Sequence, residues 1–240
     1  MRYLKAVGLK KAFRKRTVVK GVDLEVHKGE IVGLLGPNGA GKTTTFYMIA
    51  GLVRVNEGQI FLDEQEITSF PLAKRARLGL TYLPQERSIF RELTVEKNIL
   101  AVLEVAGFNK EERKTRKDLL LEEFHLVDLA SSKAQTLSGG EARRLEIARA
   151  VAIEPSFILL DEPFAGIDPV TVAQIQTYLQ YLRRKGMGIF ISDHNVRETL
   201  KICDRAYIMH QGQILESGSP QKIARSPQVR DIYLGRDFKL

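Results

Sequence analysis

Short apolar runs alternate with amphipathic segments along most of this chain. The runs at 30–36, 59–62, 78–84, 156–163 and 187–194 have the length and composition of buried strands. Apolar residues at helical spacing predict helices between them, one from about 42 to 50–52 and another over 170–185. Parallel strands need crossover connections of this kind, so the pattern predicts an α/β core with a parallel sheet.

Three regions depart from this alternation. Residues 3–13 and 22–26 alternate between apolar and polar, which predicts strands with one exposed face. From about 94 to 134 the spacing becomes helical, and together with a helix after Gly139 this region predicts an inserted helical lobe. Residues 205–218 predict a hairpin that turns at Gln-Gly, and two short helices are expected to close the chain.

The composition is that of a globular protein, with 44% hydrophobic residues among 240. No apolar run approaches the roughly 20 residues that cross a bilayer, and the charged N-terminus lacks the apolar stretch of a signal peptide. The single cysteine, Cys203, allows no internal disulfide and no cysteine-based zinc site. We therefore expect a protein of the reducing cytoplasm, in which Cys203 is a small buried apolar side chain.

The formal net charge of +8 is compatible with nucleic acid, an anionic membrane surface or no specific partner. The basic residues lie in short clusters, such as 14–16 and 183–185, with acidic residues between them. There is no long basic tail, and no aromatic residues are interleaved to stack on bases. This distribution favours a solvated surface, with proximity to the inner face of a membrane as the second interpretation.

The strongest chemical signal is GPNGAGKT at 36–43, which follows a predicted strand, opens a predicted helix and fits G-x-x-x-x-G-K-[ST]. Glycines let successive amides turn towards phosphate oxygens, and the helix N-terminus adds partial positive charge. Lys42 is expected to reach the β- and γ-phosphates of ATP, and the Thr43 hydroxyl to bind Mg²⁺. A glycine-rich turn without a ligand is the alternative, which this context disfavours. The predicted nucleotide-binding residues of the loop are Gly36, Pro37, Asn38, Gly39, Ala40, Gly41, Lys42, Thr43 and Thr44.

Two adjacent carboxylates end the predicted strand FILLDE. Ligands of open α/β sheets bind at the carboxyl ends of the strands, and strand alternation sends neighbouring side chains in different directions. We expect Asp161 to hold the Mg²⁺ shell through water and Glu162 to polarise the attacking water. The alternative is an acidic turn before Pro163, which the phosphate loop makes the weaker interpretation.

Two further polar residues follow predicted strands. Gln85, in YLPQE, is a neutral amide that can contact both the metal and the attacking water, although the signal is weak by itself. His194 ends a predicted strand where an imidazole can bond the γ-phosphate, and only that position favours function, because a lone histidine is more often structural. Both are candidate catalytic residues, and Gln85 is also a candidate metal ligand.

A second glycine-rich helix start lies in QTLSGGEARR at 135–144. A helix that begins at Ser138, Gly139 and Gly140 offers free amides, hence a second anion site, while a simple N-cap at Ser138 is the alternative. One phosphate chain has little room for two such helix ends from the same subunit. The sequence therefore predicts a head-to-tail homodimer, with each ATP between 36–43 of one copy and 137–141 of the other.

In order along the chain, GPNGAGKT, YLPQE, LSGGE, FILLDEP, AGID and SDH resemble the motifs of the nucleotide-binding subunit of ABC transporters. The resemblance covers nearly the whole chain and implies one P-loop ABC ATPase domain over 1–240. It implies a RecA-like core at about 1–90 and 155–240, with an N-terminal antiparallel β subdomain, and an inserted α-helical subdomain at about 91–154.

The resemblance also implies roles for particular residues. It implies the same head-to-tail dimer, with AGID at 165–168 across the dimer seam, and it gives Phe13 the adenine-stacking position, where the family often has tyrosine. Phenylalanine keeps the π-face and loses the hydroxyl. The signature ends in Glu141 where many members have glutamine, so no ligand role is assigned to Glu141.

Within the family, PQERSIFREL and the ending IYLGRDFKL are similar to the ATPases that drive lipopolysaccharide export from the inner to the outer membrane. ATPases of branched-chain amino-acid importers share the length and much of the pattern and remain the alternative. Either resemblance implies two transmembrane partner subunits and a peripheral position on the cytoplasmic face of the bacterial inner membrane. Phe90 and Arg91 are candidates for the partner contact, with an ordinary exposed loop as the alternative.

Two other functions fit the sequence less well. Soluble ABC proteins that act on nucleic acid or ribosomes usually fuse two cassettes or insert long coiled coils or zinc modules, which this chain lacks. A small-molecule kinase built on the same loop leaves LSGGE unexplained. We therefore expect no specific nucleic-acid partner.

Overall fold

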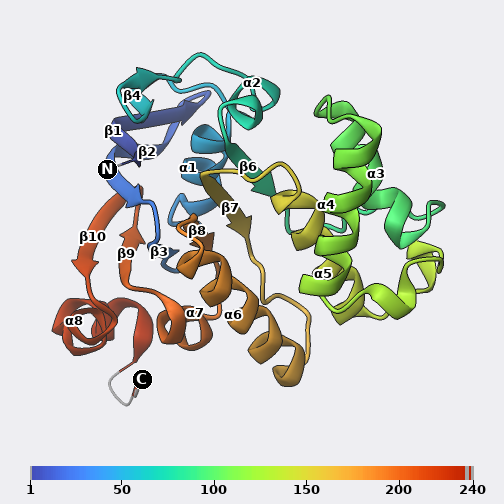
Figure 1. Ribbon diagram of the computed structural model, residues 1–240. Helices are drawn as coiled ribbons and strands as arrows, with labels where there is room; N and C mark the ends of the chain where they lie inside the picture. Colours follow the sequence, from blue (N-terminus) through green and yellow to red (C-terminus); the bar gives the residue numbers. More distant parts are fainter. Residues whose placement is uncertain (1, 236–237, 239–240) are drawn as a thin grey trace.

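The computed structural model describes residues 2–235 and 238, in which two sheets lie beside a separate group of helices (Figure 1). One sheet has the strand order β2-β1-β4-β5, and the other has the order β10-β9-β3-β8-β7-β6. The predicted parallel sheet is confirmed, because β6, β7, β8, β3 and β9 all pair in parallel and only β10 pairs antiparallel. Most of the ending RDFKL, which carried part of the subfamily resemblance, lies outside the described residues.

The four-stranded sheet is antiparallel and is built from the alternating segments near the N-terminus. Its inward positions, such as Leu4 and Leu9 on β1 and Val22 on β2, are fully buried, whereas neighbouring positions are exposed. This is the pattern of a sheet with one covered face. Its strands are β1 (Tyr3–Phe13), β2 (Arg16–His27), β4 (Glu57–Leu62) and β5 (Gln65–Glu66).

The six-stranded sheet brings distant motifs to one edge. Strands β3, β7 and β8 are buried at every position, as expected for parallel strands covered on both faces. Since these neighbours run in the same direction, the segments after 35, 161 and 192 leave the sheet side by side. The strands are β3 (Ile31–Leu35), β6 (Leu80–Leu83), β7 (Phe157–Asp161), β8 (Gly188–Ser192), β9 (Arg205–His210) and β10 (Gln213–Gly218).

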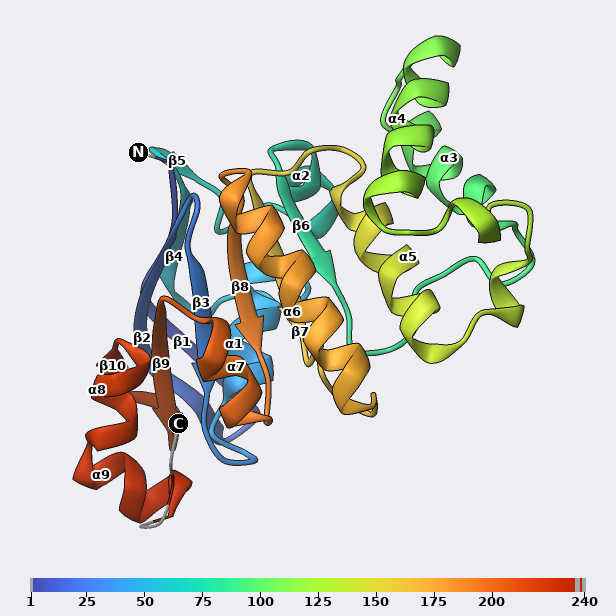
Figure 2. The same cartoon turned by 60° about the horizontal axis from the view of Figure 1, so that its bottom comes forward.

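Helix α1 lies between the two sheets, whereas α3, α4 and α5 lie together to one side of the sheets in two views (Figures 1 and 2). None of the helices in the described part of the chain has the length and apolar character needed to cross a membrane. The helices are α1 (Lys42–Ala50), α2 (Leu72–Arg77), α3 (Val95–Val105), α4 (Lys110–Glu123), α5 (Gly139–Val151), α6 (Pro169–Arg184), α7 (Val196–Ile202), α8 (Pro220–Arg225) and α9 (Pro227–Val229), with shorter helical turns at Val127–Leu129, Ala134–Thr136 and Arg230–Leu234.

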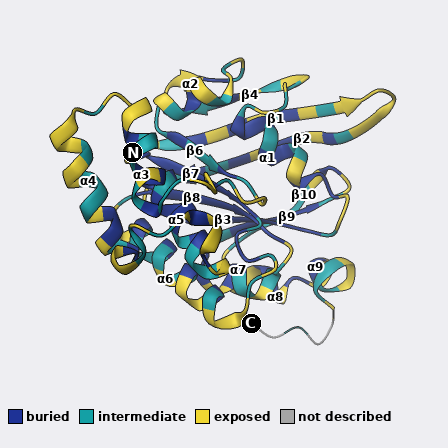
Figure 3. Cartoon of the chain, turned by 90° about the vertical axis from the view of Figure 1, so that its right-hand side faces the viewer, coloured by how far each residue is buried: buried dark blue, intermediate teal, exposed yellow. Residues whose placement is uncertain are grey.

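The helical lobe is joined to the parallel sheet by a shared apolar core. Ile99 of α3, Phe124 after α4 and Leu145 of α5 are fully buried and belong to the same cluster as Ile158 of β7. Burial is concentrated on the strands, while much of the outer surface of α4 is exposed (Figure 3). The lobe therefore packs through one side only, as its amphipathic spacing predicts.

Helix α1 packs in the apolar core that the two sheets share. Phe46 stacks on Phe190 of β8 with ring centroids 5.0 Å apart, and Ile49 lies in the cluster that includes Val22 and Leu34. A helix held by both sheets presents its N-terminus at a fixed place beside the end of β3. This core positions the phosphate loop.

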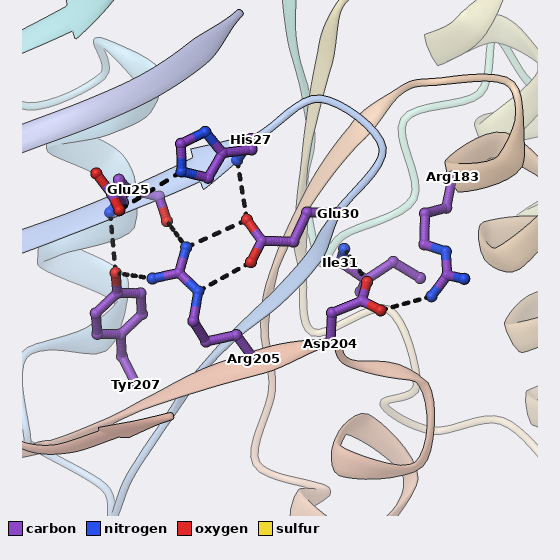
Figure 4. Close-up of polar contacts among 8 residues, drawn as sticks. All are labelled: Glu25, His27, Glu30, Ile31, Arg183, Asp204, Arg205 and Tyr207. Atoms are coloured by element: carbon purple, nitrogen blue, oxygen red, sulfur yellow. Dashed lines mark hydrogen bonds and ion pairs between the residues drawn. The ribbon is translucent and has the colours of Figure 1, made fainter. Parts of the chain in front are cut away.

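A polar network holds the opposite end of the parallel sheet (Figure 4). The Arg205 guanidinium lies 2.9 Å from the Glu30 carboxylate, and Asp204 accepts a hydrogen bond from the amide of Ile31 at 2.9 Å. Asp204 also pairs with Arg183 at the end of α6, at 2.7 Å. These contacts fix the start of β3 against β9, so the loop at the far end of β3 begins from a constrained strand.

Most of the elements expected from the pattern are present, including the hairpin turn, where Gln211 and Gly212 have φ of 47° and 87°. Cys203 is buried, as predicted. The pattern did not predict α2 or α7, which have six and seven residues. Helices this short have little periodicity and depend on tertiary contacts.

Arg75 supplies that contact for α2. It is 1% exposed, and its guanidinium donates to four backbone carbonyls, those of Thr68, Phe70, Met48 and Ile49, the last two in the final turn of α1. Burial lowers the pKa of Arg75 to about 10, which leaves it charged at neutral pH. A cation at this place satisfies unpaired carbonyls and opposes the negative end of the helix dipole.

Replacing Arg75 by Met keeps the apolar stem but leaves those carbonyls buried without donors. We expect Arg75→Met to lower the free energy of unfolding by about 3 kcal/mol, since buried unsatisfied groups cost about 1–3 kcal/mol each and the site relaxes in part. Urea unfolding measures this, with Arg77→Met as the control because Arg77 is exposed on the same helix. Equal stability of the two variants would contradict the capping role.

Candidate nucleotide-binding and catalytic site

The loop after β3 fits between two other strands only because it contains glycine. A Cβ on Gly36 would lie 2.1 Å from the carbonyl oxygen of Met209, and a Cβ on Gly41 would lie 2.9 Å from that of Val18. Both glycines have positive φ, of 146° and 103°. The Gly212 amide also donates to Ala40 at 2.9 Å, so the loop is held by β2 and by the β9–β10 hairpin.

Lys42 lies inside this loop. Its side chain is 7% exposed, and its ammonium donates to the carbonyls of Gly36 at 2.6 Å and Pro37 at 3.1 Å. Burial lowers its pKa, while the charges of Glu162 and Asp193 act in the opposite direction. The ammonium is thus held over the loop and surrounded by acceptors, while Thr43 and Thr44 follow on the first turn of α1.

Asp161 is a buried carboxyl at the last position of β7. It is 3% exposed and accepts a hydrogen bond from the Tyr82 hydroxyl at 3.3 Å. Burial raises its pKa to about 6, helped by the nearby Glu162 and Asp193, while the Tyr82 hydrogen bond lowers it. Mg²⁺ prefers oxygen ligands and few carboxylates, so Asp161 and the Thr43 hydroxyl fit that ion chemically.

Glu162 and His194 form a pair that the sequence did not predict. The His194 Nδ1 lies 3.2 Å from a Glu162 carboxylate oxygen. Glu162 has a φ of 45°, unusual for a residue with a side chain, and its amide donates to Ser192 at 2.6 Å. The left-handed backbone at Glu162, and not strand alternation alone, therefore sets the direction of its side chain.

Asp193 is a further acid at this edge that sequence reasoning missed. It is fully buried and accepts hydrogen bonds from the amides of Asn195, at 2.7 Å, and Phe164, at 3.1 Å. Burial raises its pKa. The signal was present in the sequence, because Asp193 directly follows a strand and precedes His194 in SDH. Asp193 ties the segments after β7 and β8 together.

Two of the predicted residues are exposed near the site's margins. Gln85 is exposed in the segment after β6. Phe13 ends β1 with 49% of its surface exposed and the Lys11 ammonium 5.3 Å from its ring centroid. Its hairpin partner β2 touches the phosphate loop through Val18, so the aromatic face is presented by an element that contacts the loop.

Ser138 is the N-cap of α5, as the alternative interpretation of a simple helix cap predicts. Its hydroxyl accepts a hydrogen bond from the Glu141 amide at 3.4 Å, and the Glu141 carboxylate accepts one from the Ser138 amide at 2.8 Å. No hydrogen bond in the described residues joins Ser138 to the loop at 36–44. A single chain therefore does not bring the two glycine-rich helix starts together through hydrogen bonds.

Helix α5 also holds the segment that follows Gln85. The Glu146 carboxylate accepts from the Ser88 amide at 2.7 Å, and Arg149 donates to the Ser88 carbonyl at 2.6 Å. The Arg149 guanidinium lies 4.4 Å from the ring centroid of Phe90, which is 47% exposed. Arg91, next to it, is exposed as well. The two candidate partner residues thus lie on a surface segment fixed by α5.

Known proteins are similar to this chain in both sequence and fold. Residues 19–165 match the family model described as ABC transporter, so the chain belongs to the ABC transporter family. It is an ATPase cassette of that family, as predicted. Two relatives that carry the same name as each other are similar to this chain along its whole length.

The first is "Lipopolysaccharide export system ATP-binding protein LptB" of Acidithiobacillus ferridurans, 56% identical over 237 residues, which cover 99% of this chain and 98% of the relative. The second, of the same name, from Escherichia coli K12, is 53% identical over 241 residues and covers both chains completely. A crystal structure of the ADP conformation of an ATP-binding cassette of an ABC transporter is 29% identical, with a TM-score of 0.90. That match covers 98% of this chain and 100% of the other, and it confirms the predicted ABC ATPase fold.

The Tyr82 hydrogen bond predicts a pH effect. Ionised Asp161 is the form suited to Mg²⁺, so we expect kcat/KM for Mg-ATP to fall as the pH drops through about 6. Tyr82→Phe removes an interaction that lowers the pKa of Asp161 and should move this acid limb to higher pH. A pH series of kcat/KM checks it, with the distant Tyr181→Phe as the control. An unmoved limb would contradict the role of the hydroxyl.

Proposed function

We propose that this chain is the ATP-hydrolysing subunit of a lipopolysaccharide export transporter, which drives extraction of lipopolysaccharide from the inner membrane. The observation that carries the proposal is the identity of more than half of the residues over essentially the full length of two relatives with that named activity. Identity over the full length favours this assignment over an importer of branched-chain amino acids or a soluble protein acting on nucleic acid.

The phosphate loop binds ATP through its amides and through Lys42. The Lys42 ammonium, which bonds the carbonyls of Gly36 and Pro37, exchanges these acceptors for β- and γ-phosphate oxygens when ATP enters. Thr43 and Asp161 would hold Mg²⁺, Asp161 through water, with Gln85 as a further ligand from the segment after β6. Bound Mg²⁺ neutralises charge on the phosphates. Phe13 stacks on the adenine from the tip of its hairpin.

Glu162 orients the attacking water and takes up its proton during hydrolysis. The Glu162 carboxylate lies beside His194 whereas that of Asp161 lies beside Tyr82, which supports different roles for the two acids. The 3.2 Å contact with His194 supports a shared task, in which the imidazole holds Glu162 in place and reaches the γ-phosphate. Water attacks phosphorus, the bond to the bridging oxygen breaks, and ADP and phosphate leave.

The functional unit is a head-to-tail homodimer. Ser138, Gly139 and Gly140 present the N-terminus of α5 to an anion, and within one chain no hydrogen bond joins Ser138 to the phosphate loop. The ATP site on one copy is completed by α5 of the other copy. ATP binding therefore closes the dimer, and hydrolysis opens it.

Two transmembrane subunits receive this motion. Phe90 is a large exposed apolar side chain backed by Arg149, and Arg91 beside it is exposed. Helix α5 bonds both the amide and the carbonyl of Ser88. The segment that bears Phe90 therefore passes movement of the helical lobe to the transmembrane subunits. The protein accordingly works at the cytoplasmic face of the bacterial inner membrane.

Glu162→Gln tests the catalytic and dimer assignments together. Loss of a general base lowers rates by about 10²–10⁴-fold, so hydrolysis should fall at least about 100-fold while ATP binding is retained. The variant should accumulate as dimers with Mg-ATP, measured by phosphate release and light scattering. Glu122→Gln, an exposed carboxylate on α4, is the control. Monomers at saturating Mg-ATP would contradict the head-to-tail dimer.

Purification of tagged Glu162→Gln protein from gently solubilised native membranes tests the pathway. We expect two related transmembrane subunits of the lipopolysaccharide export type, identified by mass spectrometry. Importer subunits would keep the motor but overturn the cargo, and ribosomes or DNA without membrane protein would overturn transport.

The same purification tests the partner contact. The double variant Phe90→Ala, Glu162→Gln should no longer copurify with the transmembrane subunits. It should still form the ATP-dependent dimer, because the Phe90 ring is exposed and its loss leaves the core intact. Leu119→Ala, an exposed apolar residue on α4, is the matched control and should retain them. Retention by both variants would place the contact elsewhere.

A further inference from the structure

One carboxylate oxygen of Glu141 accepts hydrogen bonds from both donor groups of Ser138, its amide and its hydroxyl. The Ser138 amide donates to it at 2.8 Å and the Ser138 hydroxyl donates to the same atom at 2.7 Å. The reciprocal bond from the Glu141 amide to the hydroxyl is longer, 3.4 Å. The hydroxyl has one proton, so while it donates to Glu141 it cannot donate to another anion.

The carboxylate is also charged. Hydrogen bonds from Ser138, first of all from its hydroxyl, lower the pKa of Glu141, and the more distant Arg144 contributes less. Among the described residues, no ion pair within 4 Å joins Glu141 to a basic side chain. The Arg87 guanidinium lies near the tip of α5, 3.6 Å from the position of a Cβ on Gly139, but it makes no ion pair with Glu141. A γ-phosphate that approached the tip would therefore meet a carboxylate at the donors it needs.

We propose that Glu141 is a placeholder for phosphate: it holds Ser138 in the open state, competes with the γ-phosphate of the facing copy's ATP, and helps the dimer to reopen after hydrolysis. The proposal rests on the head-to-tail dimer of the proposed function. It gives Glu141 a positioning role, exerted through Ser138.

A purely structural role is the competing explanation, because the same pair of bonds caps a helix. The chain contains its own comparison. Asn109 and Glu112 form the same reciprocal capping box at the start of α4, in a part of the helical lobe with no assigned ligand. Glutamine in place of either glutamate removes the charge and keeps the shape, so the Glu112 variant controls for the loss of a charged capping residue, while the Ser138 hydroxyl bond is present only at Glu141.

The experiment measures the Mg-ATP concentration that half-closes the dimer, by light scattering in the Glu162→Gln background. Adding Glu141→Gln should lower that midpoint roughly five- to tenfold, because one charge-assisted hydrogen bond no longer competes. The difference should grow as ionic strength falls. Dimer lifetime after addition of excess EDTA should lengthen. Adding Glu112→Gln instead should leave both quantities unchanged.

The possible outcomes separate the two proposals. If dimers form and Glu141→Gln leaves the midpoint unchanged or raises it, Glu141 is only a cap and the inference is wrong, while the dimer stands. If neither protein forms dimers at saturating Mg-ATP, the proposed dimer itself fails. Glu141→Ala serves as a second variant should the glutamine variant not fold, and it too should lower the midpoint.

Discussion

The site depends on an imbalance of buried charge at the carboxyl edge of the parallel sheet. Lys42, Asp161 and Asp193 are almost wholly withdrawn from water, and Glu162 stands beside them. Burial works against the charges of the three buried groups: it raises the pKa of the two aspartates and lowers that of the lysine. One ammonium does not balance three carboxylates. The excess of carboxylates suits this edge to a cation, while the Lys42 ammonium suits it to phosphate oxygens, so a ligand that brings both fits best.

The sequence predicted what is encoded locally. Glycine spacing and a following helix identify the phosphate loop, and a carboxylate after an apolar run identifies Asp161 and Glu162. Periodicity also separated the helical lobe from the strands. It could not predict contacts between remote segments, such as the Arg75 cap on α1 or the pairing of Glu162 with His194. Those depend on which strands become neighbours, and a left-handed backbone at a glutamate has no local signature.

Helix α5 links two kinds of surface. Its N-terminus carries Ser138, and its side holds the segment around Ser88 through Glu146 and Arg149. A single helix therefore joins the glycine-rich start at Ser138 to the stretch that bears Phe90. The buried Arg143–Glu146 pair, 3.0 Å apart, lies on the same helix and stiffens this connection. A displacement of the N-terminus of α5 would therefore move the segment around Ser88 directly.

The contact between Gly212 and the phosphate loop has a consequence for how the chain is made. The Gly212 amide bonds Ala40, its carbonyl accepts from Lys20, and a Cβ there would lie 2.5 Å from the Val18 carbonyl oxygen. The loop is synthesised early, but the hairpin that supports it comes from the last fifth of the chain. A nascent polypeptide can therefore give the loop at 36–44 its full support only after residues 205–218 have been synthesised.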